Sequence, residues 1–155
     1  MRFLFIDIGN SAIKLMTEQK KIFTFSYSEA PGRLATLLKK LEPQALLVSS
    51  VCEKGLDFFV SNKRLIRIDC AFPFSFRIDV DNKHSIGTDR LINAEAAVEK
   101  LEHPNYLVID AGSAITIDLI TREGDTFAFK GGLIIPGETL QREGLRLNTD
   151  IPETY

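Results

Sequence analysis

The stretch at residues 108–118 decides the fold, and it reads Val-Ile-Asp-Ala-Gly-Ser-Ala-Ile-Thr-Ile-Asp. An apolar run of the kind found in buried strands ends in the carboxylate of Asp110, and a glycine then gives the backbone freedom to turn. An alternating run from residue 114 onward predicts a returning strand. Near the N-terminus, an apolar run at residues 3–6 leads into Asp7-Ile-Gly-Asn-Ser-Ala-Ile-Lys14. Two such hairpins in one chain predict a duplicated architecture.

The composition of this 155-residue chain is that of an ordinary globular protein, with 45% apolar and 26% charged residues. Its net charge of −2 argues against nucleic-acid binding through bulk positive charge. No apolar stretch approaches the roughly 20 residues of a membrane-spanning helix, and the N-terminal run is too short for a signal-peptide core. We therefore expect no nucleic-acid or membrane partner and a cytoplasmic location. Cys52 and Cys70 are expected to be reduced thiols.

The spacing of apolar residues predicts an α/β fold. Strands are expected at residues 2–8, 11–17 and 21–27, followed by an amphipathic helix at 33–42 and a strand at 45–48. A helix at about 53–62 and a strand at 65–69 come next, and residues 71–83 are expected to be irregular. The aromatic residues of that irregular segment are candidates for a lobe edge, a pocket wall or a subunit contact. Ligands of such folds bind at the carboxyl ends of the strands.

The second half is expected to begin with a helix at about 88–101. The second hairpin follows it, and then a strand near residues 126–130, an apolar strand at 133–135 and a last helix to about residue 147. Gly131-Gly132 and Pro136-Gly137 flank the apolar strand and mark two points of close backbone approach. Two explanations of this close approach stay open: internal packing, and a wall that contacts a ligand.

The first hairpin carries the groups that a phosphate site needs. Backbone N–H groups at a glycine turn can approach an anion closely, and Asn10 and Ser11 add side-chain donors. Lys14 can supply a point charge to a phosphate. Asp7 would repel a phosphate unless a divalent cation lies between them, and Mg²⁺ held by one carboxylate and substrate phosphates fits that need. The alternative is an ordinary hairpin with a solvated lysine.

Gly87-Thr-Asp-Arg90 opens the helix expected at 88–101. An aspartate in a first helical turn is favoured by the helix dipole, so Asp89 has a purely structural explanation. An adjacent acid and arginine can also act as a general base and a substrate clamp. Phosphoryl transfer uses such a base to orient the attacking hydroxyl and accept its proton.

Together these residues resemble the type III pantothenate kinases, members of the acetate kinase/sugar kinase/heat-shock chaperone/actin superfamily. The resemblance covers nearly the whole chain and runs through four motifs in the family's order: Asp7-Ile-Gly-Asn-Ser-Ala-Ile-Lys14, Gly87-Thr-Asp-Arg90, Asp110-Ala-Gly-Ser-Ala-Ile-Thr-Ile-Asp118 and Gly131-Gly132-Leu-Ile-Ile-Pro-Gly137. It implies a ribonuclease H-like, actin-like ATPase fold of duplicated βββαβαβα lobes. Residues 1–86 would form the N-terminal lobe, and residues 87–155 the linking helix and the start of the C-terminal lobe.

The resemblance also implies an activity, the ATP-dependent phosphorylation of pantothenate to 4′-phosphopantothenate, the first step of coenzyme A biosynthesis. Asp89 would be the catalytic base, and Gly87, Thr88 and Arg90 would bind pantothenate with it. Asp110 would hold a monovalent cation, K⁺ or NH₄⁺, and Asp7 would hold Mg²⁺ through the phosphates. A homodimer is implied as well. The residues that would contact ATP and its phosphates are Asp7, Gly9, Asn10, Ser11, Lys14, Gly112 and Ser113.

The chain departs from the family pattern in three respects. Ser11 and Ser113 stand where the family usually has threonine, so the hydroxyl is retained, and Val80 stands where many members have a tyrosine. Family members continue past the last residue of this chain. We therefore expect an incomplete second lobe, as a fragment or a natural truncation.

Two alternatives to the pantothenate kinase function stay open. One is a non-catalytic or regulatory homologue that keeps the phosphate hairpins. The other is a related small-molecule kinase of the same superfamily that phosphorylates a different acceptor.

Overall fold

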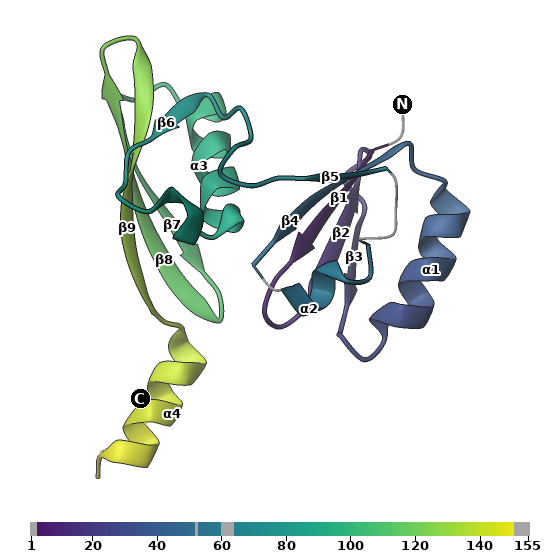
Figure 1. Cartoon of the computed structure of the whole chain (residues 1–155). Helices are drawn as coiled ribbons and strands as arrows, with labels where there is room; N and C mark the ends of the chain where they lie inside the picture. The colour runs from purple at the N-terminus through teal and green to yellow at the C-terminus, as the bar shows by residue number, and fades with distance from the viewer. Residues whose placement is uncertain (1–2, 52, 60–63, 151–155) are drawn as a thin grey trace. The chain divides into compact units, whose positions relative to one another are not determined.

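The computed structural model describes residues 3–51, 53–59 and 64–150 (Figure 1). The chain divides into two compact units. The first unit contains the residues up to Phe72 together with Gly87–Asp89, and the second contains Pro73–Ile86 and the residues from Arg90 onward. The lobe boundary between residues 86 and 87 stays a prediction.

The first unit is a mixed five-stranded sheet. Its strand order is β3-β2-β1-β4-β5, in which β1 pairs antiparallel with β2 and parallel with β4. The order of elements along the chain, three strands and then alternating helices and strands, is the predicted one. These elements are β1 (Phe3–Ile8), β2 (Ile13–Thr17), β3 (Ile22–Phe25), α1 (Ala30–Leu41), β4 (Ala45–Ser50), α2 (Glu53–Leu56) and β5 (Leu65–Arg67).

The core of the first unit lies on one face of this sheet. Alternate residues of β1 point to that face, and Leu4, Ile6 and Ile8 are at most 3% exposed. They share one hydrophobic cluster with Ala30 and Leu34 of α1, which lies along the sheet in Figure 1. Burying each large aliphatic side chain stabilises the unit by roughly 1.5–3 kcal/mol.

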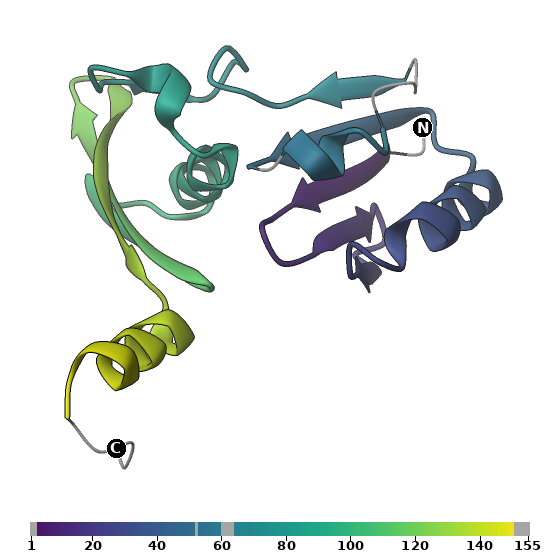
Figure 2. The ribbon, with the colours of Figure 1, turned by 60° about the horizontal axis from the view of Figure 1, so that its bottom comes forward.

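The second unit is a mixed four-stranded sheet of order β6-β9-β8-β7, in which β6 is parallel to β9 and the other pairs are antiparallel. Most of α3 packs against one face of this sheet, as the turned view in Figure 2 shows. The elements are β6 (Phe76–Ile78), a 3₁₀ turn η1 (Lys83–Ser85), α3 (Thr88–Lys100), β7 (Asn105–Ala111), β8 (Ala114–Glu123), β9 (Thr126–Pro136) and α4 (Glu138–Asn148).

One strand, β6, lies in the segment that the sequence predicted to be irregular. Three residues are too few to give a periodic signal, so the strand depends on its tertiary contacts. The Phe76 ring is 7% exposed and stacks between those of Phe74, at 5.2 Å between centroids, and Phe129, at 6.1 Å. These aromatic residues therefore pack the edge of a sheet.

Two other elements differ in extent from the prediction. The helix expected at about 53–62 ends at Leu56, and a turn leads to Phe59, which is 1% exposed; residues 60–62 lie outside the described residues. The strands expected at 126–130 and 133–135 are one strand, β9. A register shift opposite Leu119 and a φ of +80° at Gly131 mark a β-bulge, which joins the two segments.

The two sheets differ in how their corresponding faces are covered. Counting back from Asp110 and Asp7, Leu107 and Ile109 correspond to Leu4 and Ile6. Leu107 and Ile109 are 68% and 62% exposed, whereas Leu4 and Ile6 are 3% and 2% exposed. In both views α4 continues beyond the end of β9, and none of its residues is buried (Figures 1 and 2). In the described chain this apolar face is therefore open.

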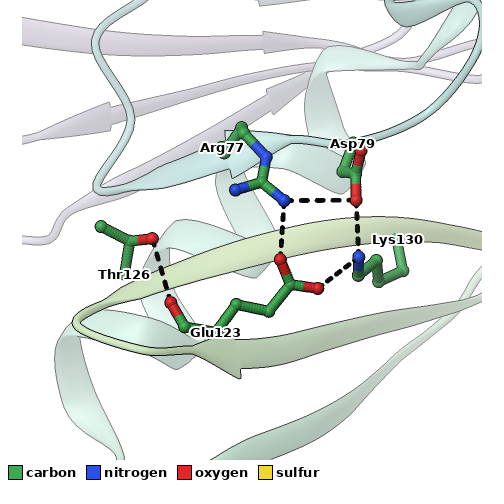
Figure 3. Close-up of polar contacts among 5 residues, drawn as sticks. All are labelled: Arg77, Asp79, Glu123, Thr126 and Lys130. Carbon is green, nitrogen blue, oxygen red and sulfur yellow. Dashed lines mark hydrogen bonds and ion pairs between the residues drawn. The ribbon is translucent and has the colours of Figure 1, made fainter.

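The opposite end of that same face carries a network of four charges (Figure 3). Arg77 Nη2 lies 2.6 Å from Glu123 Oε2 and 3.4 Å from Asp79 Oδ2. Lys130 Nζ lies 2.5 Å from Asp79 Oδ2 and also pairs with Glu123. The network therefore connects β6, β8 and β9 through their side chains.

The network shifts the pKa values of its members in the direction expected of paired charges. Hydrogen bonds from Lys130, and then from Arg77, lower the pKa values of both Asp79 and Glu123. The hydrogen bond to Asp79, followed by the one to Glu123, raises the pKa of Lys130. All four side chains are at least 30% exposed, so solvent screens these pairs strongly.

The lowered carboxylate pKa values predict a pH dependence of stability. A group whose pKa is depressed on folding stabilises the folded state above its unfolded pKa, about 4 for Asp and Glu, and loses that contribution as pH falls through the folded pKa. At neutral pH the Lys130→Gln variant should therefore melt at a slightly lower temperature than the wild type. The difference should vanish in acid, as thermal unfolding at a series of pH values would reveal.

The matched control for this experiment is Arg142→Gln, which removes an isolated exposed pair to Glu138 on α4. Its melting temperature should differ little from that of the wild type at any pH. A Lys130→Gln difference that persisted at the same size into strong acid would contradict the role given to the network.

Candidate functional site

The two Asp-Gly-Ser hairpins have the same register. In the first, Asp7 pairs with Lys14 across the strands. In the second, Asp110 pairs with Thr116. The loop of the second hairpin is one residue shorter because it has no counterpart of Asn10. The duplication predicted from the sequence therefore extends to strand pairing.

The same hydrogen bond closes both loops. The amide of Gly9 donates to the carbonyl of Ala12 at 3.1 Å, and the amide of Gly112 donates to the carbonyl of Ala114 at 2.9 Å. A short loop closed in this way holds the preceding aspartate at the end of its strand.

The glycine of each loop is not required by the protein's own structure. Neither Gly9 nor Gly112 has a positive φ. The nearest atom to a Cβ built on Gly9 would be 3.5 Å away, and 3.7 Å away for Gly112, which are ordinary contact distances. The missing side chain therefore leaves space in front of both loops, and close approach of a ligand is a reason for glycine there.

Three polar side chains lie in one row across the first sheet. Asp7 is paired with Lys14 on β2 and with Ser49 on β4, so all three point to the same face. Ser49 is 4% exposed, and its Oγ has no hydrogen-bond partner in the described structure. Buried hydroxyls are normally paired. Ser49 is not among the site residues predicted from the sequence, although its place at the end of a predicted parallel strand is a signal for it.

The second hairpin is fixed from both sides. Asn93 Nδ2 of α3 donates to Asp110 Oδ2 at 3.1 Å. The amide of Gly137 donates to the carbonyl of Ser113 at 3.0 Å. A Cβ at Gly137 would lie 2.2 Å from the carbonyl oxygen of Gly112, so only glycine fits there. The expected close approach at Pro136-Gly137 is confirmed, and its reason is packing against the hairpin loop.

The Gly87-Thr-Asp segment belongs to the first unit, and glycine matters there too. A Cβ at Gly87 would lie 2.5 Å from Asp89 Oδ1 and 3.5 Å from Val51 Cγ1. The Asp89 carboxylate therefore folds back over the backbone of Gly87. Thr88, between them, is 8% exposed. The absence of a side chain at Gly87 thus allows the position of the Asp89 carboxylate.

Arg90 makes a buried ion pair with Asp118 of β8. Its Nε lies 3.0 Å from each carboxylate oxygen, and its Nη2 also donates to Oδ1. The two side chains are 11% and 1% exposed. The guanidinium also lies 5.9 Å from the centre of the Phe129 ring. In the sequence prediction Asp118 is only the last residue of a motif and has no role of its own.

Close backbone packing surrounds this ion pair. A Cβ at Gly132 would lie 1.9 Å from the carbonyl oxygen of Ile117 and 2.8 Å from Asp118 Oδ1. Gly132 therefore lets β9 approach β8 beside the buried carboxylate. The close approach predicted at Gly131-Gly132 is confirmed, and a Cβ on Gly131 would lie 3.2 Å from Val80 Cγ1. Val80, at the position where family members often have a tyrosine, thus packs beside the bulge.

The described residues contain no group of three or more His, Cys, Asp or Glu side chains arranged to hold a metal ion. The carboxylates of Asp7 and Asp110 each lie near the end of a strand, and neither belongs to such a group within the described residues. Such a donor set fits Mg²⁺ that completes its coordination with water and substrate phosphates, rather than a cage made by the protein.

Comparisons with known proteins give the family. The model of the family described as Type III pantothenate kinase matches residues 3–152. The chain belongs to this family. A type III pantothenate kinase from Azobacteroides pseudotrichonymphae is 30% identical over 161 residues and one from Flavobacterium johnsoniae is 31% identical over 170 residues. They align with 96% and 98% of the chain, which spans 62% and 68% of their lengths.

A solved structure supports the fold. The crystal structure of a protein from Campylobacter jejuni, described as a Baf family transcriptional activator, aligns with a TM-score of 0.61 and 24% identity. The alignment covers 95% of this chain and 61% of the other. The actin-like α/β class predicted from the sequence is confirmed.

Within the described residues, no helix is long and apolar enough to cross a membrane.

Replacing Gly132 with alanine tests the close packing beside Asp118. The new methyl group would meet backbone atoms that cannot move independently, and such overpacking typically destabilises a protein by about 1–3 kcal/mol. The melting temperature of Gly132→Ala should therefore be several degrees below that of the wild type, as circular dichroism would measure.

Gly144→Ala is the matched control, because Gly144 lies within α4 and a Cβ added there would meet no atom within 4 Å. Alanine in an exposed helix favours folding by roughly 0.5–1 kcal/mol relative to glycine. Equal melting temperatures for the two variants would refute the packing described for Gly132.

Proposed function

We propose that this protein transfers the γ-phosphoryl group of ATP to pantothenate and forms 4′-phosphopantothenate, the first step of coenzyme A biosynthesis. Membership of the type III pantothenate kinase family supports the reaction class. The observation that carries the proposal is the matched register of the two hairpins, with Asp7 and Asp110 at equivalent positions. Each loop has a carboxylate and an open glycine, which suits the binding of a phosphate group.

The first hairpin would bind the phosphates of ATP. The amides and side chains of Gly9, Asn10 and Ser11 supply donors at the loop, and Lys14 supplies a positive charge on the neighbouring strand. Asp7 would hold Mg²⁺ through the phosphates. When bound, Mg²⁺ neutralises charge that develops on the phosphates.

The second hairpin would also contact ATP and would hold the monovalent cation. Gly112 and Ser113 contribute an open loop with a hydroxyl, by analogy with Gly9 and Ser11. Asp110 would hold the monovalent cation, K⁺ or NH₄⁺, and Asn93 already orients its carboxylate. The loop rests on Gly137, so these donors are held before the ligand arrives.

The Gly87-Thr-Asp-Arg90 segment would bind the acceptor. Asp89 would accept the proton of the attacking pantothenate hydroxyl, which makes the oxygen a better nucleophile as the γ-phosphoryl group is transferred. Gly87 and Thr88 would contact pantothenate through the backbone and the hydroxyl. Arg90 would bind a polar group of the same substrate.

The same proposal includes a location and an oligomeric state. In line with the resemblance to the family, we propose that the enzyme acts in the cytoplasm as a homodimer. A non-catalytic homologue and a kinase for another acceptor are the alternatives. The first would bind ligands without turnover, and the second would phosphorylate another hydroxylated acid or sugar in a panel of acceptors.

Substitution of Asp89 with asparagine tests the proposed base. The amide keeps the size of the side chain but cannot accept a proton, and general-base catalysis typically contributes about 10²–10⁴-fold. Turnover should fall by that factor, which corresponds to on the order of 3–5 kcal/mol of activation barrier. Steady-state kinetics with pantothenate and ATP would measure the loss, and calorimetry should find both ligands still bound.

Asp125→Asn is the control, because Asp125 lies in the turn between β8 and β9, away from the motifs. It should retain wild-type turnover. Undiminished turnover of the Asp89→Asn variant would remove Asp89 from the role of base. Binding of both ligands without any turnover by the wild type would favour the non-catalytic homologue.

A further inference from the structure

Asp118 has a position that its family motif alone does not explain. It is 1% exposed, in the middle of a sheet, and carboxylates are almost never so deeply buried unless they are paired. Its partner is Arg90, the last residue of the motif that the proposed function assigns to the acceptor substrate. The buried carboxylate thus acts directly on a residue of the candidate site.

The geometry of the pair fixes the arginine more firmly than a single contact could. Both carboxylate oxygens contact Nε, and Nη2 makes a further bond to Oδ1, so the guanidinium plane and the carboxylate plane are locked together. Phe129 lies beside the guanidinium. A lysine could satisfy the charge of Asp118 but could not be held in this orientation.

The surroundings hold Asp118 in turn. Gly132 brings the backbone of β9 against it, and the adjacent bulge at Lys130 and Gly131 changes the register immediately beyond. Bulges commonly redirect side chains near functional sites. The carboxylate has little room to follow a moving arginine, so the pair holds Arg90 in one place.

We propose that Asp118 is a positioning residue, which holds the Arg90 guanidinium so that it can bind the carboxylate of the acceptor substrate. The inference rests on the proposed function, because it takes pantothenate as the acceptor. Asp118 does not contact the substrate. It neutralises the buried arginine and sets the direction of the guanidinium, whose planar fork matches a carboxylate.

The test compares two ligands that differ only at the group in question. Pantothenate has a carboxylate, and pantothenol has an alcohol in its place. In the Asp118→Asn variant, calorimetry should give a pantothenate Kd weaker by about ten- to a hundredfold, the range expected when a hydrogen bond to a charged group is lost. The Kd values of pantothenol and ATP should be unchanged.

A spectroscopic signal reports on Arg90 itself. The Nε–H group of an arginine held by a carboxylate exchanges slowly and gives its own resonance in a nitrogen–proton NMR spectrum. In the wild type this resonance should be present and should shift when pantothenate is added. In the Asp118→Asn variant it should be broadened or lost, and a purely structural role would not produce the shift with pantothenate.

Two further variants serve as comparisons for Asp118→Asn. Arg90→Lys retains the charge without the planar fork, and it should lose pantothenate affinity as Asp118→Asn does. Asp79→Asn removes a carboxylate from an ion pair of the same unit without touching Arg90, and it should keep wild-type affinity for every ligand. If Asp118→Asn does not fold, the Arg90 Nε–H resonance of the wild type decides the question: the role of Asp118 is contradicted if this resonance is absent or does not shift with pantothenate.

The outcomes separate this inference from the proposed function. If the wild type binds no pantothenate, the proposed function fails and this inference fails with it. If the wild type binds pantothenate and Asp118→Asn binds it equally well, only the role of Asp118 fails. Equal weakening of pantothenate and pantothenol would also overturn it, because the effect would then not involve the substrate carboxylate.

Discussion

A strand that ends in a carboxylate and turns back over a short glycine loop is the constraint that organises both units. The loop bond from Gly9 to Ala12 holds Asp7 at the strand end, and the bond from Gly112 to Ala114 does the same for Asp110. Because the register is the same in both hairpins, the two carboxylates occupy equivalent positions along their strands. The phosphate and cation roles proposed for the hairpins depend on this repeated geometry.

The buried pair of Arg90 and Asp118 connects the second hairpin to the last residue of the motif that is proposed to bind the substrate. Asp118 lies on β8, the returning strand of the hairpin, and Arg90 lies in the first turn of α3. Removing one member of such a pair typically costs about 3–5 kcal/mol, because the other charge remains buried alone. The ion pair therefore fixes α3 to β8 at Arg90. The proposed role of Arg90 in binding the acceptor thus depends on β8, the same strand that follows the loop of the second hairpin.

Local patterns predicted much of this structure. Apolar runs that end in Asp-x-Gly indicated both hairpins, and the leucine spacing indicated α1. Tertiary contacts account for what the patterns missed. The strand β6 forms because Phe76 packs between two other rings. The contacts of Ser49 and Asp118 depend on strand register, and register over long sequence separations cannot be deduced from one sequence.

The most direct measurement of the central claim incubates the protein with pantothenate and ATP and follows the phosphorus NMR spectrum. If the protein is a pantothenate kinase, a phosphomonoester signal of 4′-phosphopantothenate should grow at the rate at which ADP forms. Formation of ADP with inorganic phosphate alone would contradict this function, and so would an unchanged spectrum under conditions in which both ligands are bound.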